Sequence, residues 1–256
     1  MKHLPWTREQ TIVALNLYCK IPFNKVSSSH PEIIKYSSLI GRSPNSLKMK
    51  IGNFGSFDIE LKKRGIVGLA HTAKLDEEIW NEYSSDWEKL AYESEMLISS
   101  LEGISIYKKI VDIDYEQKDN GEVIRNVKTR INQNFFRSTV LSSYNNTCGI
   151  TGLQIPELLV ASHIIPWKDR IDTRINPRNG ICLNALHDKA FDRGFITITS
   201  DFKVKVSKYI FSKYNDSAVI WIKQYDGMLL NLPEKFYPEI DFIKYHNKEI
   251  FEKWKD

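Results

Sequence analysis

The feature that most constrains this chain is a histidine placed between an apolar run and a polar loop. His163 lies within "LLVASHII" (158–165), a second apolar run, "GICLNAL", covers residues 180–186, and helix-forming residues follow that second run. Short apolar runs bounded by polar turns favour strands, so this stretch predicts a strand, a loop, a strand and then a helix. The neighbouring residues leave three roles open for His163: a buried core histidine, a metal ligand or a proton acceptor.

The helix expected after the second run carries acidic side chains on one face. Asp188 and Asp192 are spaced so that a helix brings both to the same side. Carboxylate oxygens suit Mg²⁺ or Mn²⁺, and His187 beside them offers an imidazole nitrogen as a further ligand. Together with His163 on a strand and Asn179 in the loop, these residues predict a β–β–α metal site.

These residues give the chain a resemblance to the HNH (ββα-metal) endonucleases. The segments "SHIIPW" and "NGICLNALHDKAFDRG" are similar to members of the restriction endonuclease type, and the likeness extends over roughly residues 128–250. The resemblance implies that His163 is the general base and that Asn179 braces the loop and orients this histidine. It also implies a metal held among His187, Asp188 and Asp192, without deciding which of them bind directly. On this basis the catalytic residues are His163, Asn179 and His187.

The sequence departs from the family at two places. Many members carry Asp, Glu or His just before the general base, where this chain has Ser162, a weaker ligand. Many also hold a structural zinc in two C-x-x-C pairs, and the equivalent positions here are Cys148, Thr151, Asn184 and His187. Because these cannot form a Cys₄ site, we predict no structural zinc. If His187 packs there instead, the two aspartates carry the metal.

The N-terminal part of the chain is predicted to be helical. Thr7 is suited to cap a first helix, a second is expected over residues 32–40, and Ser43 and Pro44 are suited to begin a third. Two helices joined by a glycine-containing turn are typical of a helix-turn-helix, which predicts DNA recognition. A small helical domain without DNA contact is the alternative. We expect residues 76–102 to form one long acidic helix that connects this module to the rest.

The distribution of charge supports contact with a polyanion. Residues 1–75 carry 12 Lys and Arg against 4 Asp and Glu, a net charge of +8, whereas residues 76–100 carry 8 acidic residues against one Lys. A basic block of this kind fits DNA, although an ordinary solvated surface explains it equally well. The side chains that we expect to contact DNA are Arg42, Asn45, Lys48, Lys50, Arg137, Lys168, Arg170, Lys189 and Arg193.

The order of the expected elements indicates an α+β fold in two domains. Residues 1–102 form the helical module with its connector helix, residues 103–127 a linker or a hairpin at the Asn-Gly pair, and residues 128–256 the nuclease domain. Within the last part, "FITITSDFKVKVS" predicts two strands, residues 218–225 a further strand, and residues 238–254 a helix.

Composition restricts the class of protein. The 256 residues are 42% hydrophobic with three cysteines, and we find neither a signal peptide nor an apolar run long enough for a membrane span, so we expect a cytoplasmic protein without a membrane partner. The expected function is metal-dependent cleavage of double-stranded DNA in restriction or defence, by a homodimer with the acidic helix as its interface. The alternatives are a DNA-binding regulator and a reader of modified DNA, each with a weak or inactive HNH scaffold.

Overall fold

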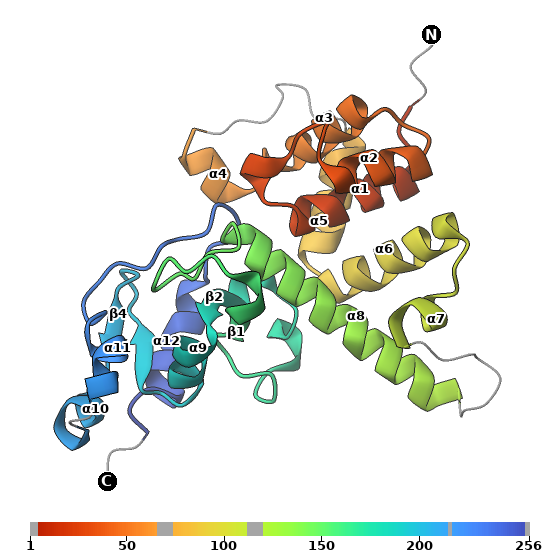
Figure 1. The fold of residues 1–256 in the computed structure, drawn as a ribbon. Helices are drawn as coiled ribbons and strands as arrows, with labels where there is room; N and C mark the ends of the chain where they lie inside the picture. The colour runs from red at the N-terminus through yellow and green to blue at the C-terminus, as the bar shows by residue number, and fades with distance from the viewer. Residues whose placement is uncertain (1–4, 66–73, 112–119, 215–216, 254–256) are drawn as a thin grey trace. The chain divides into compact units, whose positions relative to one another are not determined.

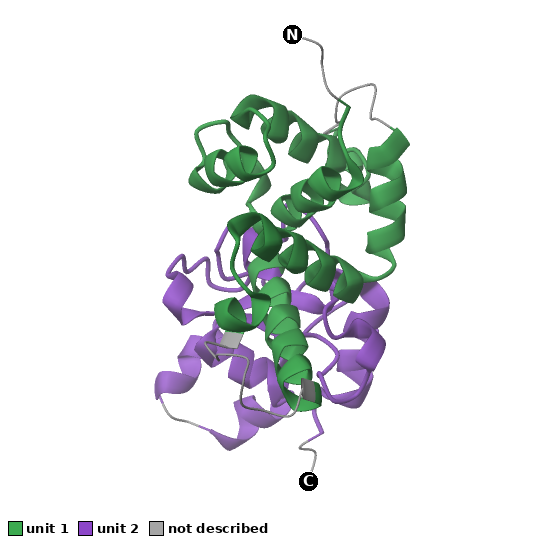
Figure 2. Ribbon diagram, turned by 90° about the vertical axis from the view of Figure 1, so that its right-hand side faces the viewer, with its two compact units in different colours: residues 1–139 green, residues 140–256 purple. Residues whose placement is uncertain are grey.

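The computed structural model describes residues 5–65, 74–111, 120–214 and 217–253, which form two compact units, residues 1–139 and 140–256 (Figures 1 and 2). In its described part, unit 1 contains the helices α1 (Arg8–Lys20), α2 (Pro31–Leu39), α3 (Pro44–Phe54), α4 (Ile59–Lys63), α5 (Lys74–Ser84), α6 (Trp87–Glu102), α7 (Ile106–Val111) and most of α8 (Asn120–Ser143). Unit 2 contains β1 (Leu159–His163), β2 (Gly180–Asn184), α9 (Ala185–Asp192), β3 (Ile196–Ile198), β4 (Val204–Val206), α10 (Lys208–Lys213), α11 (Ile220–Lys223) and α12 (Ile240–Glu249). Helices with small sheets confirm the α+β class. Over the described ranges, no helix is both long and apolar enough to cross a bilayer.

Helix α1 forms the centre of unit 1. Its residues 11–19 are all buried, and it packs against α3, α5 and α6. A helix surrounded in this way needs apolar side chains on every face, which explains its weak amphipathic pattern. Thr7 begins it as predicted: its hydroxyl accepts from the Gln10 N–H, and the Gln10 side chain accepts from the Thr7 N–H, which completes a capping box.

Helices α2 and α3 form where the sequence predicted them. The ring of His30 accepts from the N–H of Glu32 at the start of α2, and Ser43 accepts from the N–H of Ser46 at the start of α3. Pro44 occupies the first position of α3, where its missing N–H leaves no bond unmade. The two helices pack against each other. A role of this pair in DNA recognition stays a prediction.

The acidic segment 76–102 is not one helix. It is divided between α5 and α6, because Asp86 leaves helical geometry (φ −145°, ψ 81°) and its carboxylate accepts from the N–H of Lys89 as the cap of α6. An aspartate side chain bonds to nearby backbone N–H groups more readily than most side chains do, which favours the start of a new helix. Ser85 and Asp86 therefore separate α5 from α6, where the acidic pattern had predicted one continuous helix.

The acidic helices balance much of the basic block inside unit 1. In the described part of unit 1, five ion pairs connect the two segments: Arg8–Glu82 (2.6 Å), Lys20–Glu95 (3.6 Å), Lys35–Glu102 (2.7 Å), Lys50–Asp76 and Lys74–Glu78 (3.5 Å). The net charge of +8 therefore overstates the positive charge that this unit presents to a polyanion.

The region expected to be a linker or hairpin is largely helical where the structure describes it. It contains α7, and the Asn-Gly pair that predicted a hairpin instead begins α8, in which Glu122 provides a favourable charge in the first turn. Residues 112–119 lie outside the described residues. Helix α8 therefore starts before residue 128.

Unit 2 is built around an antiparallel hairpin and one helix. In this hairpin Leu159 pairs with Asn184 and His163 with Gly180, and α9 packs on both strands. Strands β3 and β4 pair as predicted, and α12 packs against β3. The strand expected at 218–225 is wrong: part of this apolar run forms α11, because short apolar runs do not distinguish strand from helix.

Candidate active site

A cleft of about 540 Å³ opens in unit 2 beside β1 and α9. Its walls come from β1 and the loop after it, from α9, and from the end of the C-terminal helix. The lining residues are Val160, Ala161, His163, Pro166, Trp167, Lys168, Asp188, Lys189, Asp192, Arg193 and Ile250. The histidine that ends β1 and the two aspartates of α9 therefore face one space.

The backbone fixes the tautomer of His163. Its Nε2 lies 2.8 Å from the carbonyl oxygen of Arg174, and since a carbonyl can only accept, Nε2 carries the hydrogen and Nδ1 the lone pair. The ring also meets Trp167 edge-on at a centroid distance of 5.6 Å. Burial lowers the pKa of His163, against the opposing effects of the Arg174 carbonyl and the charge of Asp188. The ring is thus neutral near pH 7, the state that a proton acceptor needs.

Asn179 holds the loop that follows His163. Its Oδ1 accepts from the N–H of Ile165 (2.8 Å), and its Nδ2 donates to the carbonyls of Ile165 and Thr173 (both 3.1 Å). The side chain is fully buried and does not line the cleft. These bonds connect residues on both sides of the loop, and the bracing role of Asn179 in the reaction stays a prediction.

Asp188 and Asp192 form an acidic pair on α9. Burial raises the pKa of Asp188, with Ser162, Lys189 and His163 acting in the opposite direction. Burial also raises the pKa of Asp192, and the charge of Asp188 adds to the rise. Two partly desolvated carboxylates that repel each other are suited to hold a hard divalent cation.

The comparison with known families decides which proteins this arrangement is similar to. A family model described as HNH endonuclease matches residues 148–199, a range that contains β1, β2, α9 and β3. We refer to this matched segment, residues 148–199, as the HNH domain. No curated protein matches significantly. The matched range includes His163, Asn179, Asp188 and Asp192, and it does not distinguish a restriction type.

The metal set expected for the HNH domain is only partly assembled. Among the described residues, no group of three or more His, Cys, Asp or Glu side chains is placed to hold a metal ion. Asp188 and Asp192 fit a hard cation by their chemistry. The hydroxyl of the buried Ser162 acts on the Asp188 carboxylate. The protein thus offers the cation two carboxylates and leaves further positions to other oxygen atoms.

The structure does not bring His187 to the cleft of the HNH domain. Its Nδ1 lies 3.0 Å from Oδ1 of Asn184, and its ring meets Tyr225 edge-on at 5.1 Å. Successive helical residues point about 100° apart, so a side chain next to Asp188 faces a different direction. The prediction of His187 as a catalytic residue and metal ligand therefore does not fit its position.

His187 instead contacts Asn184, and both residues stand at positions equivalent to structural zinc ligands in the family that the sequence resembles. The other two equivalent positions are Cys148 and Thr151. The Cys148 sulfur accepts from the N–H groups of Thr151 (3.5 Å) and Asn184 (3.2 Å), and Asn184 Nδ2 donates to the Thr151 hydroxyl (3.3 Å). Direct hydrogen bonds thus connect the turn at residues 148–151 to Asn184, the residue before α9.

The cationic candidates of unit 2 gather around the cleft of the HNH domain. Lys168, Lys189 and Arg193 line it, which suits contact with phosphate groups. Arg170 is exposed and paired with Asp172. Arg137 is exposed on α8 in unit 1.

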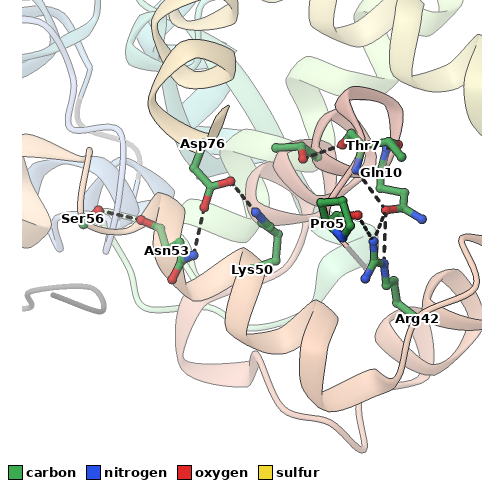
Figure 3. A network of polar contacts seen from close by, with 9 residues as sticks. Pro5, Thr7, Gln10, Arg42, Lys50, Asn53, Ser56 and Asp76 are labelled. Atoms are coloured by element: carbon green, nitrogen blue, oxygen red, sulfur yellow. Dashed lines mark hydrogen bonds and ion pairs between the residues drawn. The ribbon is translucent and has the colours of Figure 1, made fainter. Parts of the chain in front are cut away.

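The DNA-contact candidates of unit 1 divide into two groups. Arg42 donates to Gln10 Oε1 through Nε (3.1 Å) and Nη2 (2.8 Å), which ties the turn before α3 to α1 (Figure 3). Lys50 is only 4% exposed and is paired with the buried Asp76, so the prediction that it contacts DNA does not fit its position (Figure 3). Asn45 is exposed and Lys48 half-buried, and both stay available.

Sequence reasoning missed two contributors to the site of the HNH domain. The Arg174 carbonyl carries no residue-specific signal, because every residue has one. Ile250 reaches the cleft from the end of the chain, and only the packing of α12 on β3 brings it there.

Proposed function

We propose that this chain is a metal-dependent DNA endonuclease and that the cleft of the HNH domain is its active site. The observation that carries the proposal is His163, whose Nε2–H is held by the Arg174 carbonyl in a cleft shared with Asp188 and Asp192. Phosphodiester hydrolysis needs an activated water and neutralisation of negative charge, and this cleft places a base beside a cation site and basic side chains.

Each side chain has a distinct part in this reaction. Nδ1 of His163 takes a proton from the attacking water, while the carbonyl of Arg174 stabilises the ring as it becomes charged. Asp188 and Asp192 would hold Mg²⁺ or Mn²⁺, which supplies charge neutralisation at the phosphate and at the departing oxygen when it is bound. Lys168, Lys189 and Arg193 position the DNA backbone. Asn179 keeps the loop of residues 164–178 in place.

Replacing His163 by Ala tests the assignment. Loss of a positioned general base costs about 10²–10⁴-fold in rate, so we expect cleavage of plasmid DNA with Mg²⁺ or Mn²⁺ to fall by that factor while DNA binding persists. Asp241→Asn is the matched control, because that side chain is 80% exposed on α12. EDTA should abolish the activity of the unaltered protein. Undiminished cleavage by the His163→Ala protein would contradict the assignment of His163 as the general base.

The wider setting that we propose is restriction or defence by a homodimer. It is supported by the resemblance of the HNH segments to the restriction type and by the need for two active sites to cut both strands. The exposed Met96 (41%) and Leu101 (43%) on α6 offer apolar surface for an interface. Sedimentation at several protein concentrations tests the dimer, which a monomer at all concentrations would contradict.

A second candidate is a DNA-binding protein with a weak HNH scaffold. The observation in its favour is that the acidic pair has no third protein ligand among the described residues, with Ser162 where the family often has a stronger one. DNA binding without any metal-dependent nicking would favour this second function over the first.

A further inference from the structure

A second pocket of about 370 Å³ lies in unit 2 at the start of α9, and it shares no lining residue with the active-site cleft. We name it the His187 pocket. Its apolar wall consists of Leu153, Leu158, Ala185, Leu186 and Trp221, and its other lining residues are Thr151, Asn184, His187, Gln224 and Tyr225. Pockets of this size with a few converging polar groups are typical of sites for small ligands.

The hydrogen bonds of Asn184 fix the tautomer of His187. Asn184 Oδ1 accepts the backbone N–H of His187 at 3.0 Å, and because a backbone N–H can only donate, the amide oxygen of Asn184 is the atom that faces His187. The same oxygen lies 3.0 Å from Nδ1 of the His187 ring. Nδ1 therefore carries the hydrogen, and Nε2 carries a lone pair.

That lone pair has no donor among the described residues. His187 is 2% exposed, and its Nε2 is buried without a hydrogen-bond partner. One buried acceptor, the Nε2 lone pair, is thus left without a hydrogen. Leaving a buried acceptor unsatisfied is costly, so a group with a hydrogen to donate would stabilise the site.

The surrounding rings indicate a planar ligand. The Tyr225 ring stands nearly perpendicular to His187 (83°) at 5.1 Å, and Trp221, which lines the pocket, is 59% exposed. Proteins that bind nucleobases extruded from a DNA duplex or in single strands use aromatic ring faces together with hydrogen bonds to the edge of the base. The amide of Gln224 adds a donor and an acceptor to the lining.

We propose that the His187 pocket binds an amino-bearing nucleobase, cytosine or adenine, whose exocyclic –NH₂ donates to Nε2 of His187. The amino group supplies the hydrogen that Nε2 of His187 lacks, and the ring occupies the space beside Trp221 and Tyr225. The base comes from a free nucleoside or from a nucleotide turned out of DNA. The second source rests on the proposed function, and the first is independent of it.

Nucleoside binding tests the pocket without any cleavage. Titration of the metal-free protein with cytidine and adenosine, followed by calorimetry or NMR, is compared with uridine and inosine, which carry a carbonyl in place of the amine. A site that pairs with an amine rejects the analogue without it, so we expect at least about 10-fold tighter binding of the amino nucleosides. The His187→Phe protein should lose this preference, because phenylalanine keeps a ring but has no acceptor.

A second variant guards against a folding defect in His187→Phe. Trp221→Ala removes an exposed ring, and we expect about 10-fold weaker binding of both amino nucleosides with unchanged thermal unfolding. Absence of binding by all four nucleosides at millimolar concentration, or equal affinities for amine and carbonyl partners, would show that only water occupies the pocket and would overturn the proposal.

A DNA arm distinguishes the two sources of the base. The His163→Ala protein is mixed with a duplex that contains 2-aminopurine, whose fluorescence rises when the base leaves the stack. A rise that Trp221→Ala abolishes supports a base turned out of DNA, whereas nucleoside binding without a rise supports a free ligand. Failure of nucleoside binding with intact plasmid cleavage would reject the pocket and keep the proposed nuclease.

Discussion

Asp188 and Asp192 share the active-site cleft at a cost to stability. Burial raises the pKa of both carboxyls, and the charge of Asp188 raises that of Asp192 further. A raised pKa means that the fold favours the protonated form, so the ionised pair destabilises the metal-free protein at neutral pH. This cost disappears as the pH falls through the raised pKa values. The metal-binding role that we propose for the two carboxylates would explain why they occupy a place where they lower stability.

Asp192→Asn should therefore stabilise the metal-free protein while it weakens metal-dependent cleavage. We expect a higher melting temperature at pH 7, and a smaller gain at pH 4, where the carboxyl of the unaltered protein is partly protonated. Thermal unfolding in EDTA at the two pH values measures this. The exposed Asp241→Asn serves as the control and should change little. A lower melting temperature for Asp192→Asn at pH 7 would contradict the sign of this argument.

At the scale of elements, the end of α9 is fixed by the C-terminal segment. Gly194 follows the helix with a φ of +70°, and a Cβ there would lie 2.1 Å from the carbonyl oxygen of Ile250. His246 on α12 reinforces the contact, since its Nε2 donates to the Phe191 carbonyl (3.1 Å) and its ring stacks on Phe191. The helix that carries both aspartates is thus held by residues near the end of the chain.

Gly194→Ala should be strongly destabilising for this reason. The left-handed φ alone costs about 1–2 kcal/mol, and the backbone clash adds about 1–3 kcal/mol, measured as the change in free energy of unfolding in urea. Gly152→Ala separates the two effects, because Gly152 has a φ of +74° but no atom within 4 Å of the added Cβ. Equal losses for the two variants would show that the clash has no role.

The helices of unit 1 depend on a buried ion pair. Lys50 on α3 meets Asp76 on α5, with exposed side-chain fractions of 4% and 0%, and Asn53 donates to the same carboxylate at 2.9 Å (Figure 3). Removing one partner of a buried pair leaves an uncompensated charge, so Lys50→Ala should cost about 3–5 kcal/mol of unfolding free energy.

Two variants control for this effect. Lys35→Ala removes a surface pair with 50% exposure of the lysine and should cost less than about 1 kcal/mol. The double variant Lys50→Met/Asp76→Leu should recover most of the loss, because no charge stays buried alone. Chemical denaturation measures all three, and a small loss for Lys50→Ala would exclude the pair as a stabilising contact.

What the sequence allowed us to predict follows from how local each signal is. The cap at Thr7, the start of α3 at Pro44 and the β1–β2–α9 order depend on neighbouring residues, and the structure contains them. The break at Asp86 depends on its carboxylate accepting a hydrogen bond from the N–H of Lys89, and the direction of His187 depends on its ring bonding to Asn184. The sequence does not show which partner either side chain takes. Burial of Lys50 depends on a carboxylate from another helix, and no pattern along the chain shows such a contact.

For the whole molecule, the internal ion pairs of unit 1 limit the charge left for DNA. The cations at positions 8, 20, 35 and 50 are engaged by acidic side chains of α5 and α6. The half-buried Lys48 on α3 is the test residue for phosphate contact. A modest number of phosphate contacts predicts a modest dependence of affinity on salt.

Lys48→Ala should lower DNA affinity and reduce the slope of log affinity against log salt concentration by about 1. Fluorescence anisotropy with labelled duplex in EDTA, at several KCl concentrations, measures the slope. Lys35→Ala is the control, because Glu102 already pairs with that ammonium at 2.7 Å. An unchanged slope for Lys48→Ala would remove α3 from the DNA-contact surface.

The hydrogen bond from His163 to the carbonyl of residue 174 has a consequence for mutational robustness. The acceptor belongs to the main chain, so it is present whichever amino acid stands at that position. Substituting Arg174 would remove its hydrogen bond to the Trp167 carbonyl and its contact with the Trp167 indole. The imidazole of His163 would still keep its proton on the same nitrogen. A substitution at residue 174 therefore leaves the proton of His163 on Nε2. Only a change that displaces the loop carrying this carbonyl would move that proton.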